Sequence, residues 1–181
     1  NNLACPQAGS PDQDGDLGRD ALARAGQLSK IGGGEAGFDY TKISNSGLPL
    51  GAGVALGTGA GDWGCTRDNV TGLIWEVKLN DATSLRHMAH TYTWYDTNAA
   101  INGGNAGTVG AAATCNSTMP QCNTSAFVAA VNAQGLCGAN DWRMPTPQEL
   151  QGIVHYGTNN PVIDPGYFPN TSLSDNAFAV W

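Results

Sequence analysis

"NDWRMPTPQEL", residues 140–150, is the most informative stretch of this sequence, because it passes from a strand-like pattern to the start of a helix. The Trp-Arg-Met triplet at 142–144 predicts a short strand with the Trp and the Met on one face. Thr146 then stands at a helix N-cap, Pro147 at the first helical position, and Glu149 three residues after the cap, as in a capping box. We therefore expect a strand-to-helix joint in which Thr146 and Glu149 have structural capping roles.

The helix that starts at this joint is expected to continue to Gly157, which can adopt the left-handed conformation of a helix stop. Its apolar stripe would be Leu150, Ile153 and Val154, at the i, i+3, i+4 spacing of a buried helix face. Because Glu149 satisfies backbone N–H groups in this arrangement, we favour capping over general acid–base chemistry as its role.

Other side chains that suggest chemistry also have structural explanations. Arg143 is expected to form an ion pair with Asp141 or Asp164, and not to clamp a substrate. His87 and His90 are three residues apart and would share one helical face, but no third metal ligand lies near them in the sequence. We therefore expect these histidines to be surface or turn residues.

The strongest strand pattern outside the joint is "DNVTGLIWEVKL", residues 68–79, in which apolar residues alternate with period two from Leu73 to Val77. A second, brief strand is expected within residues 32–43. The Gly-rich stretch at 47–64 is expected to be loop. Residues 31–64 as a whole are therefore expected to wrap a core without forming part of it.

Three further helices are predicted before the joint. The first is expected at residues 20–30. The second would open at Thr93, whose spacing to Asp96 resembles a capping box, and would end in "NGGNAG". The third would be capped by Thr124 and stopped by Gly135.

Length and charge limit the class of protein. The chain has 181 residues, which is enough for one domain with a single core. Its 8 basic and 15 acidic residues give a net charge of −7, which argues against a nucleic-acid partner. No run of 18 apolar residues occurs, so no transmembrane segment is expected.

The five cysteines favour disulfides over a zinc site, since the chain has no C-x-x-C pair. Cys115 and Cys122 close a short polar loop, and Cys65 and Cys137 each precede a predicted strand, so these are the two expected bridges. Cys5 is left over. The alternative is that all five are buried free thiols, but the low Lys content with many Asn, Thr and Gly is typical of a secreted protein.

An acidic segment near the start of the chain is a candidate calcium loop, and no other cofactor is expected. Its aspartates occupy positions 1, 3, 5 and 9 of such a loop: Asp12, Asp14, Asp16 and Asp20. Leu17 replaces the usual Gly, and Ala23 replaces the closing Glu, so the ligand set is incomplete. A solvated acidic loop is the alternative.

The tryptophans invite a sugar-stacking hypothesis. Trp75, Trp94 and Trp142 lie beside apolar neighbours at predicted strand or helix-start positions, so we expect them in the core. Trp63 lies in the Gly-rich loop and is therefore the candidate ligand-binding residue.

Several motifs in order resemble the C-terminal domain of Lcl-type collagen-like adhesins: "DNVTGLIWE", "YTWYD", "NDWRMPTPQEL", "HYGTNNPVIDPGYFPNT" and "AFAVW". The resemblance covers residues 65–181, and it makes residues 1–64 a Gly-rich N-terminal extension like that of long bacterial family members. The joint is also similar to that of formylglycine-generating-enzyme and C-type lectin-like domains. This similarity implies an α+β, C-type lectin-like fold, with short helices packed on small twisted antiparallel sheets and long ordered loops.

Two activities of the similar domains do not fit this sequence. The oxidase of the formylglycine-generating type implies a reactive cysteine pair late in the domain, but no cysteine follows Cys137. Calcium-dependent sugar binding implies a Glu-Pro-Asn or Gln-Pro-Asp tripeptide, and neither occurs. The apolar "AFAVW" at 177–181 also suggests a strand without a neighbour, so we expect a longer native chain or an oligomer.

We therefore carry three functional hypotheses. The favoured one is a non-enzymatic extracellular or cell-surface module for adhesion or recognition, whose partner is a surface glycan or a protein. The second is a structural subunit that assembles with further copies of itself. The third, an enzyme of unknown type, lacks a recognisable catalytic constellation. Sulfated glycans, which the adhesin relatives imply as ligands, conflict with the −7 charge.

Overall fold

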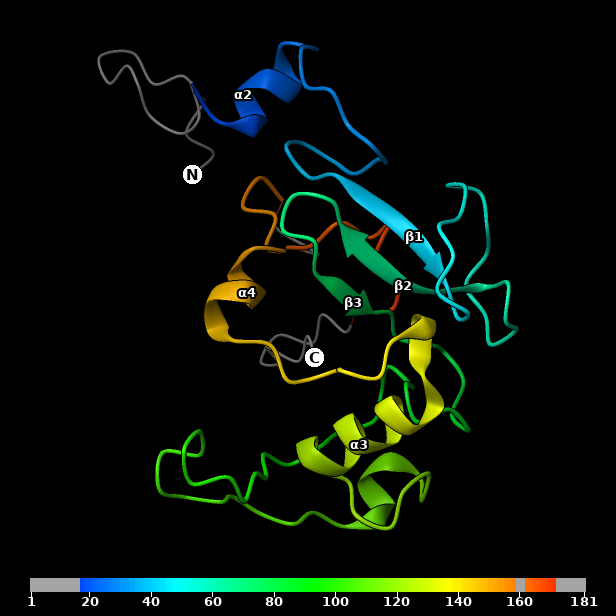
Figure 1. Cartoon of the computed structure of the whole chain (residues 1–181), viewed down its shortest axis with the longest axis vertical. Helices are drawn as coiled ribbons and strands as arrows, with labels where there is room; N and C mark the ends of the chain where they lie inside the picture. The colour runs from blue at the N-terminus through cyan, green and yellow to red at the C-terminus, as the bar shows by residue number, and fades with distance from the viewer. Residues whose placement is uncertain (1–16, 159–161, 172–181) are drawn as a thin grey trace.

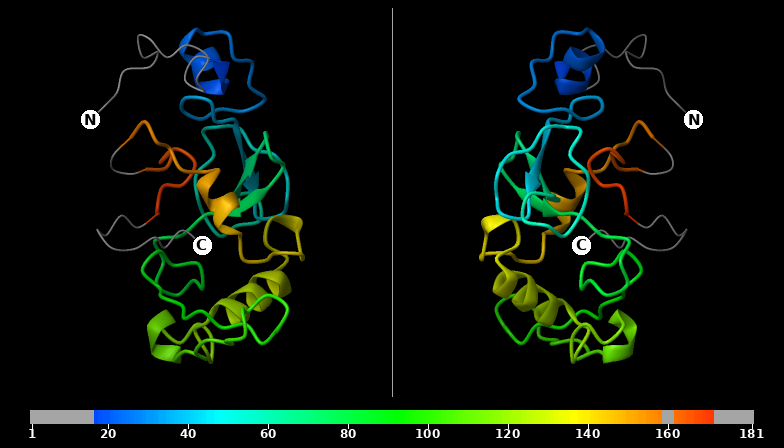
Figure 2. Two further views of the ribbon diagram at one scale, coloured as in Figure 1. Left: turned by 90° about the vertical axis from the view of Figure 1, so that its left-hand side faces the viewer. Right: turned by 90° about the vertical axis from the view of Figure 1, so that its right-hand side faces the viewer.

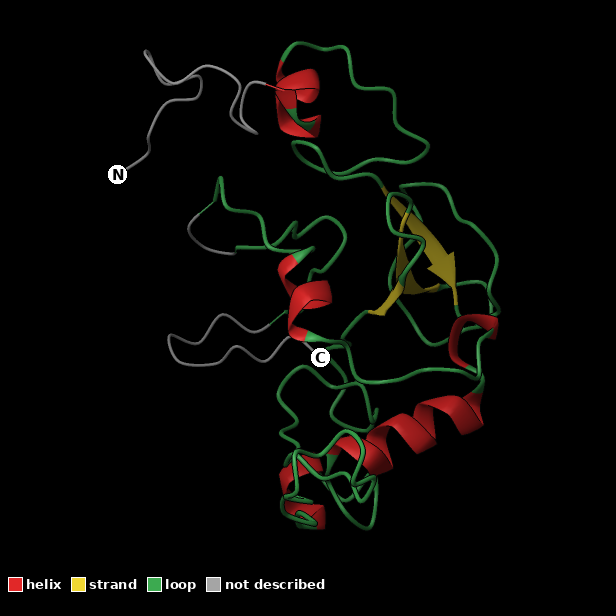
Figure 3. Cartoon of the chain, turned by 60° about the vertical axis from the view of Figure 1, so that its left-hand side comes forward, coloured by secondary structure: helices red, strands yellow, loops and turns green. Residues whose placement is uncertain are grey.

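The computed structural model describes residues 17–158 and 162–171 and has the expected α+β architecture. Three antiparallel strands form one sheet in the order β1-β2-β3, and their bounds are β1 Tyr40–Ser44, β2 Trp63–Asp68 and β3 Ile74–Glu76. The α-helices are α2 Arg19–Arg24, α3 Thr124–Gln134 and α4 Pro147–Gln151, with 3-10 turns at Ala112–Cys115 and Leu136–Gly138. Loops and turns make up most of the rest (Figure 3).

The sheet lies in the middle of an elongated molecule (Figure 1). The side views place α2 beyond one end of the sheet and α3 beyond the other (Figure 2). β2 is the central strand and is buried at every position except Arg67, because strands pair with it on both sides. The turn from β2 to β3 is fixed by the Asp68 carboxylate, which accepts hydrogen bonds from Val70 N and Thr71 Oγ1.

The alternation predicted for the strand at 68–79 is present: Trp75, Val77 and Leu79 are buried, with less buried residues between them. The expectation that residues 31–64 only wrap the core is wrong. Tyr40 and Ile43 are fully buried in β1, and β1 pairs along β2. The brief strand expected within residues 32–43 is present as β1, and its pairing with β2 makes it part of the core.

The predicted helix at Thr93 is absent. Thr93 instead forms a β-bridge with Asn123, and its hydroxyl donates to the carbonyl of Thr108 at 2.6 Å. The helix predicted after it is present as α3, with Gly135 in the left-handed conformation at its end. Its N-cap is Asn123 and not Thr124, because the Asn123 side chain accepts from Ala126 N while the Thr124 hydroxyl bonds to Tyr95.

Three other element boundaries differ from the prediction. The helix expected at 20–30 is limited to α2. The Trp-Arg-Met triplet at 142–144 is not a strand, because no neighbouring strand pairs with it among the described residues. α4 ends at Gln151 with Gly152 as its C-cap, so neither Gly157 nor His155 belongs to the helix.

Two clusters of buried residues form the core. The cysteine cluster contains both predicted disulfides, Cys65–Cys137 and Cys115–Cys122, together with apolar residues that include Phe127 and Val131. The aromatic cluster consists of Tyr40, Trp75, Ile153, Ile163 and Phe168. Cys5 and the strand expected at 177–181 lie outside the described residues.

Candidate ligand-binding cavity

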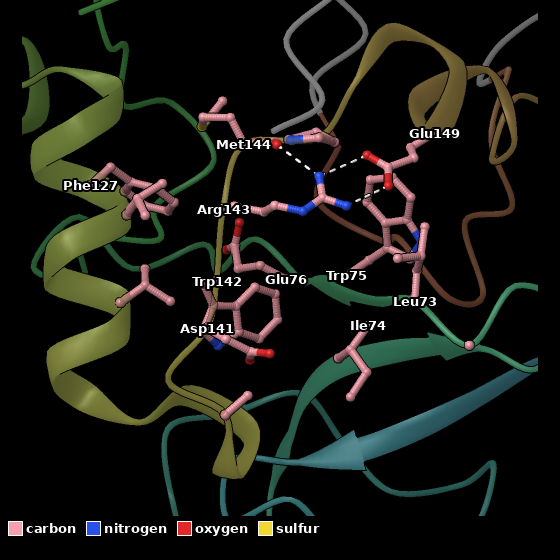
Figure 4. A pocket seen from close by; sticks show the side chains of 15 residues that line it. Leu73, Ile74, Trp75, Glu76, Phe127, Asp141, Trp142, Arg143, Met144 and Glu149 are labelled. Atoms are coloured by element: carbon pink, nitrogen blue, oxygen red, sulfur yellow. Dashed lines mark hydrogen bonds and ion pairs between the residues drawn. The ribbon is translucent and has the colours of Figure 1, made fainter. Parts of the chain in front are cut away.

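A cavity of about 370 Å³ lies between β3, α3 and the segment that leads into α4 (Figure 4). β3 and the turn before it form one wall, α3 forms the second, and residues 139–145 with Glu149 form the third. The lining side chains are Leu73, Ile74, Trp75, Glu76, Phe127, Val128, Val131, Ala139, Asp141, Trp142, Arg143, Met144, Pro145 and Glu149, and the Gly72 backbone completes it. The joint that the sequence singled out is thus one wall of the cavity.

The cavity lies where the two core clusters meet. Phe127 and Val131 belong to the cysteine cluster, and Ile74 and Trp142 pack against it. Trp75 belongs to the aromatic cluster on the opposite side. The lining residues therefore come from both clusters, and the cavity is a space that neither cluster fills.

The wall at 139–145 is irregular but held firmly. Asn132 on α3 donates from Nδ2 to the Trp142 carbonyl at 2.9 Å and accepts from Trp142 N at 2.7 Å. The Trp142 indole donates to the Leu136 carbonyl at 3.0 Å. The Asn132 amide thus supplies the backbone hydrogen bonds that Trp142 would have taken from a neighbouring strand, and the turn carbonyl holds the indole in place.

The capping box predicted at the start of α4 forms the rim of the cavity. Thr146 Oγ1 accepts from Glu149 N at 3.3 Å, and Glu149 Oε2 accepts from Thr146 N at 2.7 Å. The Glu149 carboxylate also forms a bidentate pair with Arg143, at 2.5 and 2.9 Å (Figure 4). These hydrogen bonds, with that to Arg143 first, lower the pKa of Glu149 to about 2.

The predicted partners of Arg143 are therefore wrong. Among the described residues, Asp141 forms no ion pair with Arg143, and Asp164 is buried elsewhere, where it accepts from Glu35 N and Gly166 N. The capping pattern of Glu149 does not by itself reveal this pairing. A carboxylate can perform both roles, since its two oxygens offer about four lone pairs.

Glu76 is the buried charge of the site, and the sequence analysis did not identify it as a site residue. Its side chain is only 5% exposed, and Lys78 Nζ lies 2.8 Å from Oε2. Apart from this ion pair, neither carboxylate oxygen has a hydrogen-bond partner among the described residues. The alternation of the predicted strand hid Glu76, because a residue between two core positions is expected on the opposite face of the strand.

The Glu76 charge influences the interior around it. Burial, and then the negative charge of Glu76, raise the pKa of Tyr92, whose hydroxyl donates to the Leu85 carbonyl at 2.5 Å. Burial lowers the pKa of Arg86, against the opposing effect of Glu76. The Arg86 guanidinium is engaged by the carbonyls of Gly64 and Val77 and by Asn45.

The exposure of two tryptophans is the reverse of what the sequence predicted. Trp63, the candidate ligand-binding ring, is 4% exposed, donates from Nε1 to the Cys65 carbonyl and lies under the Lys42 ammonium. Trp94, expected in the core, is 44% exposed. Trp142 is half-buried and lines the cavity, so it is the tryptophan best placed to meet a ligand.

The calcium prediction is not tested by the structure. Asp12, Asp14 and Asp16 lie outside the described residues, and Asp20 lies at the start of α2, where its Oδ1 accepts from Gly37 N at 2.7 Å. Within residues 17–158 and 162–171, no group of three or more potential ligands could hold a metal ion. Calcium calorimetry on chelator-treated protein, with Asp14→Ala as the control variant, would test the loop.

Comparison with known sequences gives the family. The sequence model of the Lcl C-terminal domain matches residues 64–181, which is more than half of the chain. The chain belongs to the Lcl C-terminal domain family. The Lcl C-terminal domain match includes every residue that lines the cavity, whereas β1 precedes it and still belongs to the same sheet. No curated protein and no solved structure is significantly similar to the chain.

Among the helices of the described residues, none is both long and apolar enough to span a membrane.

Proposed function

We propose that this chain is a non-enzymatic recognition module of an extracellular or cell-surface protein, and that the cavity is its binding site. The observation that carries the proposal is a space of about 370 Å³ with apolar walls and a buried carboxylate, Glu76. Ligand sites are typically concave, mostly apolar and equipped with a few placed polar groups. A cavity of this volume is at the lower end of the range for small ligands.

The arrangement around the cavity supports binding because it is organised in advance. Trp142 is held by Asn132 and the Leu136 carbonyl, and Arg143 is held by Glu149. Side chains fixed in this way lose little conformational freedom when a ligand arrives. The two disulfides support a location in an oxidising compartment, such as the cell surface.

Filling the cavity tests the proposal. Val128 lines the cavity from α3 and is half-buried, so Val128→Phe would place a ring in the empty space. The matched control is Ala129→Phe, which adds a ring at the next, exposed position of the same helix. Binding to a glycan array and to immobilised extracellular matrix proteins should fall about tenfold or more with Val128→Phe only. Equal binding by both variants would exclude the cavity.

Assembly is the second candidate function, and an exposed apolar pair favours it. Trp94 is 44% exposed and Val109 is 40% exposed. They lie on facing segments of one loop, where Thr108 N donates to the Trp94 carbonyl at 2.9 Å. A second copy of the chain would cover these side chains. Size-exclusion chromatography with light scattering would show an oligomer that Trp94→Ser dissociates, and a wild-type monomer would exclude this candidate.

A C-type lectin-like arrangement remains part of the proposal. The small antiparallel sheet, the short helices and the long loops around them support it. An experimental structure that shows a different strand topology would remove it without affecting the cavity.

A further inference from the structure

The acceptor capacity of Glu76 is unfilled. An ionised carboxylate has about four lone-pair sites, and only Lys78 approaches this one, at Oε2. Neither oxygen has a hydrogen-bond partner among the described residues. Leaving a buried charged acceptor without donors is unfavourable.

The nearby cationic side chains cannot supply the missing donors without losing their own partners. Arg143 donates to the Met144 carbonyl and to both oxygens of Glu149. Arg86 donates to two carbonyls and to Asn45. Both oxygens are closed off from solvent in this structure, so a molecule in the cavity that Glu76 lines supplies these donors once the side chain turns toward it.

The sign of the wall charges favours a positive ligand. Asp141 and Glu149 line the cavity together with Glu76, whereas Arg143 is the one basic side chain among the described lining residues. Glu149 is paired with Arg143 and Glu76 with Lys78, so these three carboxylates and two cations leave a net charge of −1, which attracts a cation and repels an anion. The net charge of −7 acts in the same direction at long range.

The apolar lining suits the rest of such a ligand. Trp142 and Phe127 present aromatic side chains on two different walls. A cation within about 6 Å of an aromatic ring is attracted by the negative face of the ring. The protein already uses this interaction once, since Lys78 Nζ lies 4.7 Å from the centre of the Phe127 ring.

We propose that the cavity recognises an ammonium or guanidinium group on an apolar body, with Glu76 as the main acceptor and Trp142 as an aromatic wall. This inference rests on the proposed function and names the chemical class of its ligand. The same chemistry is present in a basic side chain of a partner protein and in a free organic amine.

Three probes of nearly equal shape test the charge: 2-phenylethylamine, 2-phenylethanol and 3-phenylpropionate. Calorimetry with the full chain at neutral pH should give affinity for the amine about tenfold or more above that for the alcohol, since hydrogen bonds to charged groups are the stronger ones. The propionate should bind more weakly than either. Equal affinity for amine and alcohol would leave the cavity as a site and overturn the cation inference.

Substitutions test whether the preference for the amine arises in the cavity. Glu76→Gln and the exposed Asp141→Asn should each reduce amine affinity, by about tenfold and by a smaller factor respectively, with little effect on the alcohol. Asp141→Asn keeps the test valid if Glu76→Gln does not fold. The control is Glu35→Gln, which removes the same charge from a side chain that is 56% exposed and does not line the cavity. An equal loss with Glu35→Gln would show a non-specific charge effect and overturn the inference.

A further pair of probes distinguishes the two sources. The peptide Ac-Gly-Lys-Gly-NH2 and its norleucine counterpart differ only in the ammonium group. A lysine advantage of about tenfold would indicate the side chain of a protein partner. Binding of the free amine without this advantage would indicate a small amine. Absence of binding by every probe at about 10 mM would overturn the inference, while array binding lost in Val128→Phe would still uphold the proposed function.

Discussion

The cysteine cluster and the aromatic cluster are both buried, but they are closed by different means. Two disulfides tie the cysteine cluster together, and one of them links residues that are 72 positions apart. The aromatic cluster has no cysteine and depends on ring contacts around Tyr40. One half of the core is thus restrained covalently and the other by packing alone. The cavity between them is lined by residues of both clusters.

The largest expected effect comes from the long disulfide. Loop-closure entropy predicts that replacing Cys65 and Cys137 by Ala lowers the free energy of unfolding by about 4 kcal/mol. The same change at Cys115 and Cys122, whose loop spans 7 positions, should cost about 2.5 kcal/mol. Guanidinium denaturation of the two double variants measures both values. A greater loss from the short loop would show that the packing of the buried sulfur atoms, and not loop closure, governs the cysteine cluster.

Truncation in the aromatic cluster should have the next largest effect and should remain local. Ile153 is buried there, so Ile153→Ala is expected to cost about 3 kcal/mol through lost burial and the cavity it leaves. Amide hydrogen exchange should accelerate in residues 150–158 before it does in α3, which is packed beside the disulfides. Uniform acceleration in both regions would show that the two clusters unfold as one unit.

Apart from the Cys65–Cys137 disulfide, which joins residues 72 positions apart, the features that the sequence predicted correctly depend on neighbours in the chain. The capping box at Thr146 needs only residues three positions apart, and it is present. Gly135 likewise stops α3 because its conformation is local. The short disulfide also follows from spacing, since Cys115 and Cys122 enclose one loop.

The predictions that were wrong concern features that depend on partners far away in the sequence. Trp63 is buried because β1 and β3 flank its strand, and Trp94 is exposed because its loop extends from the core. Thr93 has a capping-box spacing, yet its backbone pairs with Asn123, 30 positions later. The cavity could not be predicted either, since Glu76 and Trp142 come together only when β3 meets the segment after α3.

The stability that Glu149 contributes at the rim of the cavity should fall at low pH. The pKa of Glu149 is about 2 in the folded chain against an ordinary value of 4.5, so its stabilising effect is complete above pH 4.5 and is lost as pH falls toward 2. The difference in unfolding free energy between the wild type and Glu149→Gln should therefore shrink over this window. Urea denaturation at pH 6, 4 and 2.5 measures it. A constant difference would mean that the Arg143 pair contributes nothing.

Thr146, the N-cap of α4, provides a comparison whose effect on stability should not depend on pH. Thr146→Ala removes the hydroxyl that accepts from Glu149 N and should cost about 1 kcal/mol, the usual value for an N-cap. This loss should be similar at pH 6 and pH 4. If it disappears with acid, the hydroxyl acts only through the Glu149 carboxylate.

The smallest effects come from two tyrosine hydroxyls, one in each half of the core. Tyr92 packs against the cysteine cluster and donates to the Leu85 carbonyl, so Tyr92→Phe should cost about 1 kcal/mol, the net value of one hydrogen bond. Tyr40 is 1% exposed, and its hydroxyl has no partner among the described residues. Burial, followed by the charges of Asp68 and Asp164, raises the pKa of Tyr40, so the hydroxyl stays neutral near pH 7.

Removing the Tyr40 hydroxyl should therefore leave stability unchanged or raise it. The ring keeps its stacked contact with Phe38 and its edge contact with Phe168, while a buried polar atom without a partner disappears. The thermal unfolding of Tyr40→Phe and Tyr92→Phe, measured side by side, compares the two clusters with the same one-atom change. If Tyr40→Phe lowers the unfolding free energy as much as Tyr92→Phe does, a donor or acceptor must reach the Tyr40 hydroxyl in solution. The aromatic cluster would then be held by more than ring packing, and the contrast between the two halves of the core would fail.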